Sequence, residues 1–104
     1  MANLLTDALG VLGHPSRVDL LNWLREPKKH FPPQKDGDLE KDGACAVLIA
    51  KKWDVAQPTA SRHLKLMVDA GLLIPTRKKG WTFYRRDEAG IAKLQAALEK
   101  RVWR

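Results

Sequence analysis

The pattern that most constrains this chain is a pair of amphipathic helical segments separated by a gap too short to hold another element. The first segment covers residues 44–53 and the second covers about 57–70, with residues 54–55 in the turn between them. In the second segment the apolar side chains recur at helical spacing: Ala60, Leu64, Met67 and Val68. One stripe of this helix is therefore expected to be buried, which leaves its polar side chains on the other faces.

Residues that favour β-structure follow directly after the second helical segment. The runs LLIPTR and WTFYRR are separated by KKG, which predicts a hairpin over residues 72–86 with glycine in its turn. Apolar periodicity predicts further helices over residues 4–12, 15–25 and 88–103. The expected fold class is mainly α with a small β-hairpin, in which four helices, two strands and a last helix form one domain over residues 1–104.

Residues 26–43 interrupt this pattern and are called the insert below. They hold three prolines, two glycines and nine charged side chains, a composition that predicts a long loop. Loops longer than about 12–15 residues are often functional. We expect Asp42 to cap the helix that follows. The acids of the insert alternate as in a calcium loop, but Lys41 and Val47 stand where such a loop needs a glycine and a bidentate glutamate.

Charge indicates the kind of partner that the chain binds. Lys and Arg total 19 against 12 Asp and Glu, and the resulting net charge of +7 favours a polyanion. A helix, a tight turn, a helix and a basic hairpin form the layout of a winged helix-turn-helix, whose second helix enters the major groove of DNA. The candidate DNA-binding side chains on that helix are Gln57, Thr59, Ser61, Arg62, His63 and Lys65. Those in the hairpin, or wing, are Arg77, Lys78, Lys79, Arg85 and Arg86.

The sequence offers little support for other chemistries. No catalytic triad, carboxylate pair, phosphate-binding glycine loop or metal cluster has convincing spacing, so we expect neither an enzyme nor a bound cofactor or metal. The one cysteine, Cys45, is expected to be a small buried residue, with a redox role as the alternative. The N-terminal sequence lacks a signal-peptide pattern and no apolar stretch approaches a membrane span, which predicts a cytoplasmic protein without a membrane partner.

Several stretches resemble the ArsR/SmtB family of bacterial transcriptional repressors. The resemblance rests on ALGVLGHPSR, QPTASRHLKLM, AGL and the basic hairpin that contains WTFY, and it covers nearly the whole chain. It implies a homodimer paired through its first and last helices, which represses a two-fold symmetric operator until a signal releases it. The expected interface residues are Leu4, Leu5, Leu9, Ile91, Leu94, Leu98 and Val102.

The chain departs from the metal-sensing members of that family. They carry a Cys-Val-Cys type pair before the recognition helix, whereas this chain has Cys45 at the first position and Val47 at the second. Residues 88–104 contain no histidine, although zinc-sensing members place Asp and His ligands on the last helix. Because zinc or a soft metal needs three or four convergent ligands, we do not expect metal sensing of these kinds. Ala56 replaces the serine that commonly caps the recognition helix, which forgoes about 0.5–2 kcal/mol of capping.

The sequence therefore predicts a sequence-specific DNA-binding regulator that represses as a homodimer. The alternative is a winged-helix module that binds RNA or a protein without operator specificity. We expect Arg17 to be a structural ion-pair partner, with DNA contact as the alternative, and His14 to start a helix. The sequence leaves open which inducer and operator are used, and whether the insert lines a ligand site, contacts DNA or is simply solvated.

Overall fold

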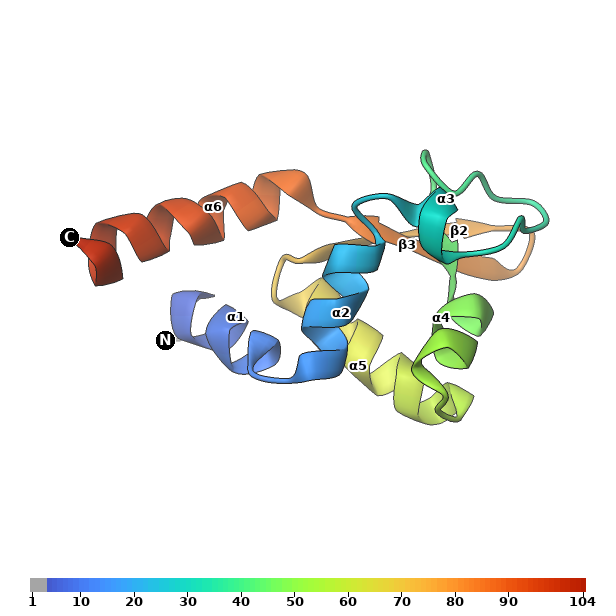
Figure 1. The fold of residues 1–104 in the computed structure, drawn as a ribbon, viewed down its shortest axis with the longest axis horizontal. Coiled ribbons are helices and arrows are strands. Elements are labelled where there is room, and N and C mark those ends of the chain that lie inside the picture. The colour runs from blue at the N-terminus through green and yellow to red at the C-terminus, as the bar shows by residue number, and fades with distance from the viewer. Residues whose placement is uncertain (1–3) are drawn as a thin grey trace.

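The expected elements follow one another along the chain in a computed structural model that describes residues 4–104 (Figure 1). The long helices are α1 (Leu4–Leu12), α2 (Pro15–Trp23), α4 (Ala46–Trp53), α5 (Gln57–Asp69) and α6 (Glu88–Leu98). Strands β2 (Leu73–Lys78) and β3 (Trp81–Arg86) form the wing. Three shorter elements complete the fold: α3 (Pro27–His30), strand β1 (Ala44–Cys45) and a π-helical turn, η1 (Glu99–Trp103). The predicted fold class, mainly α with a β-hairpin, is confirmed.

The structure corrects the sequence prediction on both sides of the insert. Pro27 starts the single turn of α3, because a proline in the first helical turn loses no hydrogen bond, so the insert is not one continuous loop. Residues 44 and 45 form β1 instead of the first turn of a helix, and they pair antiparallel with Tyr84 and Phe83. The sheet therefore has three strands in the order β1-β3-β2 rather than two. Two residues are too few to show the alternation that identifies a strand in a sequence.

The predicted start of α2 and end of α5 are confirmed. Pro15 lies in the first turn of α2, and the His14 ring nitrogen Nδ1 accepts a hydrogen bond of 3.3 Å from the Ser16 N–H. Gly71 takes a left-handed φ of 77° after α5 and ends that helix. The prediction that Asp42 caps α4 is wrong, because the N-cap residue is Cys45 and no side chain accepts a hydrogen bond there.

The hydrophobic core lies between α2, α4, α5 and the sheet. Its most completely buried large side chains are Phe83, Leu20, Ile49, Leu64, Met67, Leu72 and Leu73. The insert contributes Phe31, which is 5% exposed and packs into the same cluster. Figure 1 shows α1 and α6 side by side at one end of the molecule, with both termini, and the wing and the insert at the other. The insert is thus anchored in the core beside the wing.

Gly43 sets how closely the end of the insert approaches β3. It is buried with a left-handed φ of 98°, and a Cβ atom there would lie 1.9 Å from the carbonyl oxygen of Tyr84. Only glycine is compatible with both this backbone conformation and this contact, because a side chain at residue 43 would push the end of the insert away from β3. Gly43 thereby brings the last residues of the insert against the wing.

We expect Gly43→Ala to lower the free energy of unfolding by at least about 2 kcal/mol, because backbone strain and a steric clash act together. Gly10→Ala is the matched control, since a Cβ at this exposed helical position meets nothing within 4 Å. That control should leave stability unchanged or raise it by about 0.5–1 kcal/mol. Urea unfolding followed by circular dichroism measures both, and equal midpoints would contradict the role assigned to Gly43.

Candidate nucleic-acid interface

The turn between α4 and α5 sets the position of the candidate recognition helix. Asp54 ends α4 in a left-handed conformation with a φ of 57°, and the Val55 N–H donates a 3.1 Å hydrogen bond back to the Ala50 carbonyl. The chain then enters α5 through Ala56, with Pro58 in the first helical turn. Ala56 supplies no side-chain cap, as its replacement of serine predicted. The short connection holds α4 and α5 as a helix-turn-helix pair.

Helix α5 buries one face and leaves polar side chains on the others. Ala60, Leu64 and Met67 are each 0% exposed against the core. The exposed candidates on the same helix are Gln57, Ser61, Arg62 and Lys65, while Thr59 is half-buried. The Lys65 ammonium pairs with Asp69 at 3.1 Å, an exposed contact of small energy that a competing phosphate can replace. These side chains form a hydrogen-bonding face on α5.

His63 differs from the other candidates because its ring packs toward α2. It is half-buried, and its Nδ1 accepts a 3.0 Å hydrogen bond from the Arg17 Nε–H. Its ring centroid lies 4.9 Å from that of His14 and 5.1 Å from that of Trp53. The Arg17 guanidinium also donates to the Val11 carbonyl at 3.0 Å. Arg17 therefore has a structural role, although it acts through an imidazole and a carbonyl rather than the expected ion pair.

The surroundings of His63 favour its neutral form. Burial lowers the pKa of His63 below its usual value of 6.5, and the positive charge of Arg17 lowers it further, with smaller contributions from His14 and Arg62. A neutral ring leaves Nδ1 free to accept from Arg17, whereas a protonated ring would oppose the guanidinium. This contact links α5 to α2.

The wing presents its cations unevenly. Lys79 and Gly80 form the turn with left-handed φ values of 49° and 82°. Arg77 and Lys79 are exposed, and Arg85 is half-buried. The Lys79 ammonium lies 3.9 Å from the Asp36 carboxylate, but its side chain is 79% exposed, so this pairing is weak. Arg77 and Lys79 are thus the wing cations most accessible to a ligand.

The geometry of Arg86 does not support the expected contact with DNA. Its side chain is 16% exposed, and it donates to the Leu21 carbonyl at 3.0 Å and to both carboxylate oxygens of Glu88 at 3.0 and 3.1 Å. These bonds join the base of the wing to α2 and to the start of α6. Spacing alone did not reveal this role, because Leu21 lies 65 residues from Arg86.

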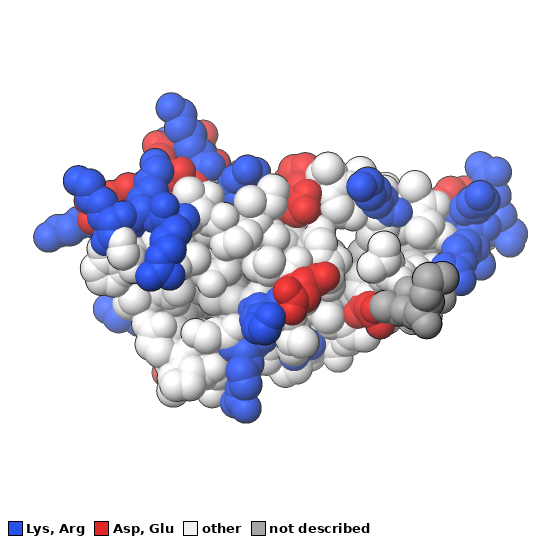
Figure 2. All heavy atoms as spheres, turned by 180° about the vertical axis from the view of Figure 1, so that it is seen from behind, with Lys and Arg blue, Asp and Glu red and all other residues white. Residues whose placement is uncertain are grey.

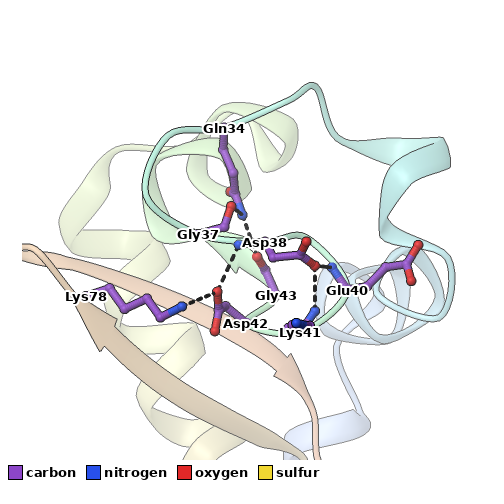
Figure 3. A network of polar contacts seen from close by, with 8 residues as sticks. All are labelled: Gln34, Gly37, Asp38, Glu40, Lys41, Asp42, Gly43 and Lys78. Carbon is purple, nitrogen blue, oxygen red and sulfur yellow. Dashed lines mark hydrogen bonds and ion pairs between the residues drawn. The ribbon is translucent and has the colours of Figure 1, made fainter.

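Lys78 is paired with the insert. Figure 3 shows its ammonium reaching the Asp42 carboxylate, which it meets at 2.9 Å. The same carboxylate oxygen accepts from the Asp38 N–H at 2.9 Å. Gln34 closes the neighbouring turn by donating to the Gly43 carbonyl at 2.7 Å and accepting from the Cys45 N–H at 2.9 Å. Sequence reasoning assigned Asp42 to a helix cap and did not single out Gln34. The pairing of Asp42 with Lys78 could not be read from local spacing, because the two residues lie 36 positions apart.

Positively charged side chains gather at two ends of the molecular surface. Figure 2 shows Lys and Arg gathered over the wing and insert at one end, with Asp and Glu among them, and another basic group at the C-terminal end. Much of the surface between them on this face carries no formal charge. On this face, the largest basic groups therefore lie near the wing and near the end of the chain's last helix.

An apolar groove runs between α1, the end of α5 and α6. It has a volume of about 790 Å³. Its lining includes the apolar Leu5, Ala8, Leu94 and Ala97 together with the charged Asp69, Asp87, Lys93 and Arg101. Of the expected interface residues, Leu4, Leu9 and Val102 are 78%, 39% and 48% exposed, whereas Leu5 is buried. Ile91, Leu94 and Leu98 are half-buried, and α6 contains no buried residue. These two helices thus carry exposed and half-buried apolar side chains beside the groove.

Three further features bear on the expected chemistry. Cys45 is 7% exposed, which confirms that it is buried. Across the part of the chain that the structure describes, no three His, Cys, Asp or Glu side chains lie together in a way that could hold a metal ion. Among the same residues, every helix is too short or too polar to cross a membrane.

Comparison with known proteins places this architecture in a known class. The uncharacterized HTH-type transcriptional regulator YbzH of Bacillus subtilis (strain 168) is 37% identical over 91 residues, which cover 88% of this chain and 91% of the relative. A crystal structure of an ArsR family transcriptional regulator superposes with a TM-score of 0.69 at 18% identity, covering 97% of this chain and 92% of that one. No protein-family model matches the chain.

A second solved structure is a homodimeric winged helix-turn-helix DNA-binding domain from Mycobacterium bovis, a possible ArsR-family transcriptional regulator. It superposes with a TM-score of 0.65 at 20% identity, covering 92% of this chain and 75% of that one. The fold is thus that of the winged helix-turn-helix proteins, and the expected resemblance to ArsR-type regulators is confirmed for the fold. The chain belongs to the family of HTH-type transcriptional regulators.

The contact between Arg17 and His63 predicts how the stability of the protein depends on pH. Because the pKa of His63 is lowered in the folded state, the unfolded chain takes up the proton first as the pH falls. The contribution of His63 to stability is therefore complete above pH 6.5 and is lost as the pH falls through the lower pKa of the folded state. NMR titration of the imidazole protons should give a pKa below 6.5 in the native protein and a higher value in Arg17→Met. An unchanged pKa in that variant would contradict the contact.

Proposed function

We propose that this chain is a sequence-specific DNA-binding repressor that works as a homodimer in the cytoplasm. The proposal has residues 1–104 acting as one domain, bound to a two-fold symmetric operator and released by a signal whose chemistry is not identified. The observation that carries it is the exposed polar face of α5, which lies in one domain with a basic wing in a chain that belongs to the HTH-type transcriptional regulators. A transcriptional regulator needs no catalytic group, and the proposal includes none.

The exposed side chains of α5 suit the major groove. Gln57 at the first turn can pair with the edge of an adenine, and Arg62 with a guanine. Thr59, Ser61 and Lys65 supply hydroxyl and ammonium groups for phosphates or for further bases. Because the carboxamide and the guanidinium bind base edges with two hydrogen bonds each, Gln57 and Arg62 are the residues to which we assign sequence preference.

The wing supplies contacts that do not depend on base sequence. Arg77 and Lys79 are exposed, and Arg85 is half-buried nearer the base of the hairpin. Cations at these positions can neutralise phosphates beside the groove that α5 occupies, or enter the neighbouring minor groove. We assign Arg77 and Lys79 the larger part of this role, because Lys78 and Arg86 already have partners within the chain.

The apolar groove beside α6 supports pairing of two copies. Leu9 on α1 and Val102 at the end of the chain expose apolar surface on the same end of the molecule as the groove. A second copy that buries these faces would bring together two α5 helices related by a two-fold axis, which matches an operator made of two half-sites. The homodimeric state of the Mycobacterium bovis domain is consistent with this assembly.

Selection of bound sequences from a random DNA pool, at near-physiological salt, tests the function directly. An inverted repeat with half-sites about one helical turn apart would support a dimeric operator-binding regulator. Bound DNA without a consensus would overturn sequence-specific repression. Failure to enrich any DNA would favour the alternative, in which the winged helix binds RNA or a protein.

On the selected operator, Gln57→Ala and Lys79→Ala should have different effects. Loss of Gln57 should cost about 1–3 kcal/mol on the operator and relax the preference at one base pair. Loss of Lys79 should weaken binding to all DNA sequences about equally, and it should reduce the slope of log K against log salt by ~0.9 per contact. Fluorescence anisotropy on the operator and on single-base variants measures both. Equal losses on every sequence from Gln57→Ala would contradict its assignment.

Leu9→Glu should weaken the proposed dimer. Burial of a leucine contributes about 1.5–3 kcal/mol, so the dimer dissociation constant should rise at least tenfold. Val18→Glu is the matched control, because Val18 is 47% exposed on α2 and lies outside the proposed interface. Sedimentation equilibrium gives the dissociation constants. If both variants dimerise as the native chain does, α1 is not part of the interface.

A further inference from the structure

The insert is docked on the wing by packing as well as by charge. A Cβ atom on Gly37 would lie 2.3 Å from the Phe83 ring, so the backbone of the insert rests directly on this side chain of β3. Gly43 approaches Tyr84 of the same strand with its backbone. Between these two points, the Asp38 carboxylate accepts from the N–H groups of Glu40 and Lys41 at 2.9 and 2.8 Å (Figure 3). The turn that carries Asp42 is therefore held in place without help from Lys78.

Asp42 is the buried charged residue of this turn. Asp42 is 6% exposed as a whole residue and 9% exposed in its side chain, whereas the side chain of Lys78 is 48% exposed. The hydrogen bond from the Asp38 N–H contributes most to lowering the pKa of Asp42, and the ammonium of Lys78 lowers this pKa further. The carboxylate is thus ionised at neutral pH, and its position does not depend on an exposed, flexible chain.

A fixed carboxylate next to a wing lysine presents the same chemistry as a DNA phosphate. Both are anionic oxygen acceptors for an ammonium group at hydrogen-bond distance. DNA releases bound counterions when a protein cation neutralises a phosphate. A lysine whose charge is already partly compensated by a carboxylate neutralises less phosphate charge, so its contact with DNA releases fewer counterions. The carboxylate also repels phosphates that approach the wing. Both effects reduce the DNA affinity that the wing provides.

We propose that Asp42 is an intramolecular competitor of DNA phosphate, which holds Lys78 and lowers the sequence-independent affinity of the chain for DNA. The inference rests on the proposed function and adds a role for the insert. The second contact between the insert and the wing, from Asp36 to Lys79, acts in the same direction but is longer and more exposed. We expect base recognition by α5 to be unaffected, because the contacts of the Asp42 carboxylate are to Asp38 and Lys78, which lie outside that helix.

The test compares Asp42→Asn with the native chain on a random-sequence DNA duplex over a range of salt. Asparagine keeps an oxygen that can accept from the Asp38 N–H, so the turn is retained while the charge is removed. Release of Lys78 should tighten binding at low salt and steepen the salt slope by ~0.9 per protomer. Each fourfold rise in salt should then cost the variant more affinity than it costs the native chain, by about 3.5-fold for each protomer bound and about 12-fold for a dimer.

Two further variants show whether the effect passes through Lys78. In a Lys78→Met background, Asp42→Asn should no longer steepen the salt slope, because no ammonium is left to release. Glu26→Gln is the matched control for charge, since it removes one carboxylate and frees Lys29 of α3 instead of a wing lysine. It should change the slope by less than Asp42→Asn does. An equal change in the control, or a change that persists without Lys78, would overturn the proposal.

A final comparison does not depend on the folding of an Asp42 variant. Lys78→Met in the otherwise native chain should reduce the salt slope much less than Lys79→Met, because a lysine held by Asp42 has little phosphate contact to lose. Equal reductions would overturn the proposal. If the native chain binds neither the random duplex nor any selected DNA, the proposed function itself fails. If it binds both and Asp42→Asn leaves the slope unchanged, only the role of Asp42 is rejected.

Discussion

Burial of the apolar stripe of α5 is the constraint on which the rest of the structure depends. Ala60, Leu64 and Met67 are fully buried and can be so only if α4, α2 and the sheet close over them. Burial of one face then determines which side chains the helix leaves outside. The hydrogen bond from Arg17 to His63 adds a polar contact between α2 and α5. A hydrophobic requirement thus sets the orientation of the face that is available to a ligand.

Charge in this chain acts locally rather than as a net total. The excess of +7 favours a polyanionic partner, yet three of the five wing cations pair with carboxylates within the chain, two of them closely and Lys79 weakly. Arg86 joins the wing to α2 and α6, and Lys78 joins it to the insert. Packing of the folded chain therefore determines which wing cations remain accessible to a ligand. Under the proposed function, affinity for a phosphate backbone would therefore depend on intramolecular pairs that composition does not reveal.

The sequence predicted the elements whose signals are local. Helical spacing, prolines in first turns and the glycines at 71 and 80 located the helix-turn-helix and the hairpin, because propensity and turn geometry act over a few residues. It missed β1 and α3, which are too short to show a period. It also missed the partner of Asp42, which lies 36 residues away, and assigned that carboxylate to a helix cap. Contacts at such separations arise only when the whole chain has folded.

By itself, the sequence determined the fold class, the buried stripe of α5, the exposed Gln57 and Arg62, and the uncapped start at Ala56. The tertiary structure alone decided that His63 packs toward Arg17, that Arg86 serves the scaffold, and that the insert rests on the wing through Gly37, Gly43 and Asp42. The physical reason is the range of the interactions. Periodicity and turn chemistry are written in neighbouring residues, whereas burial and ion pairing depend on which distant segments the core brings together.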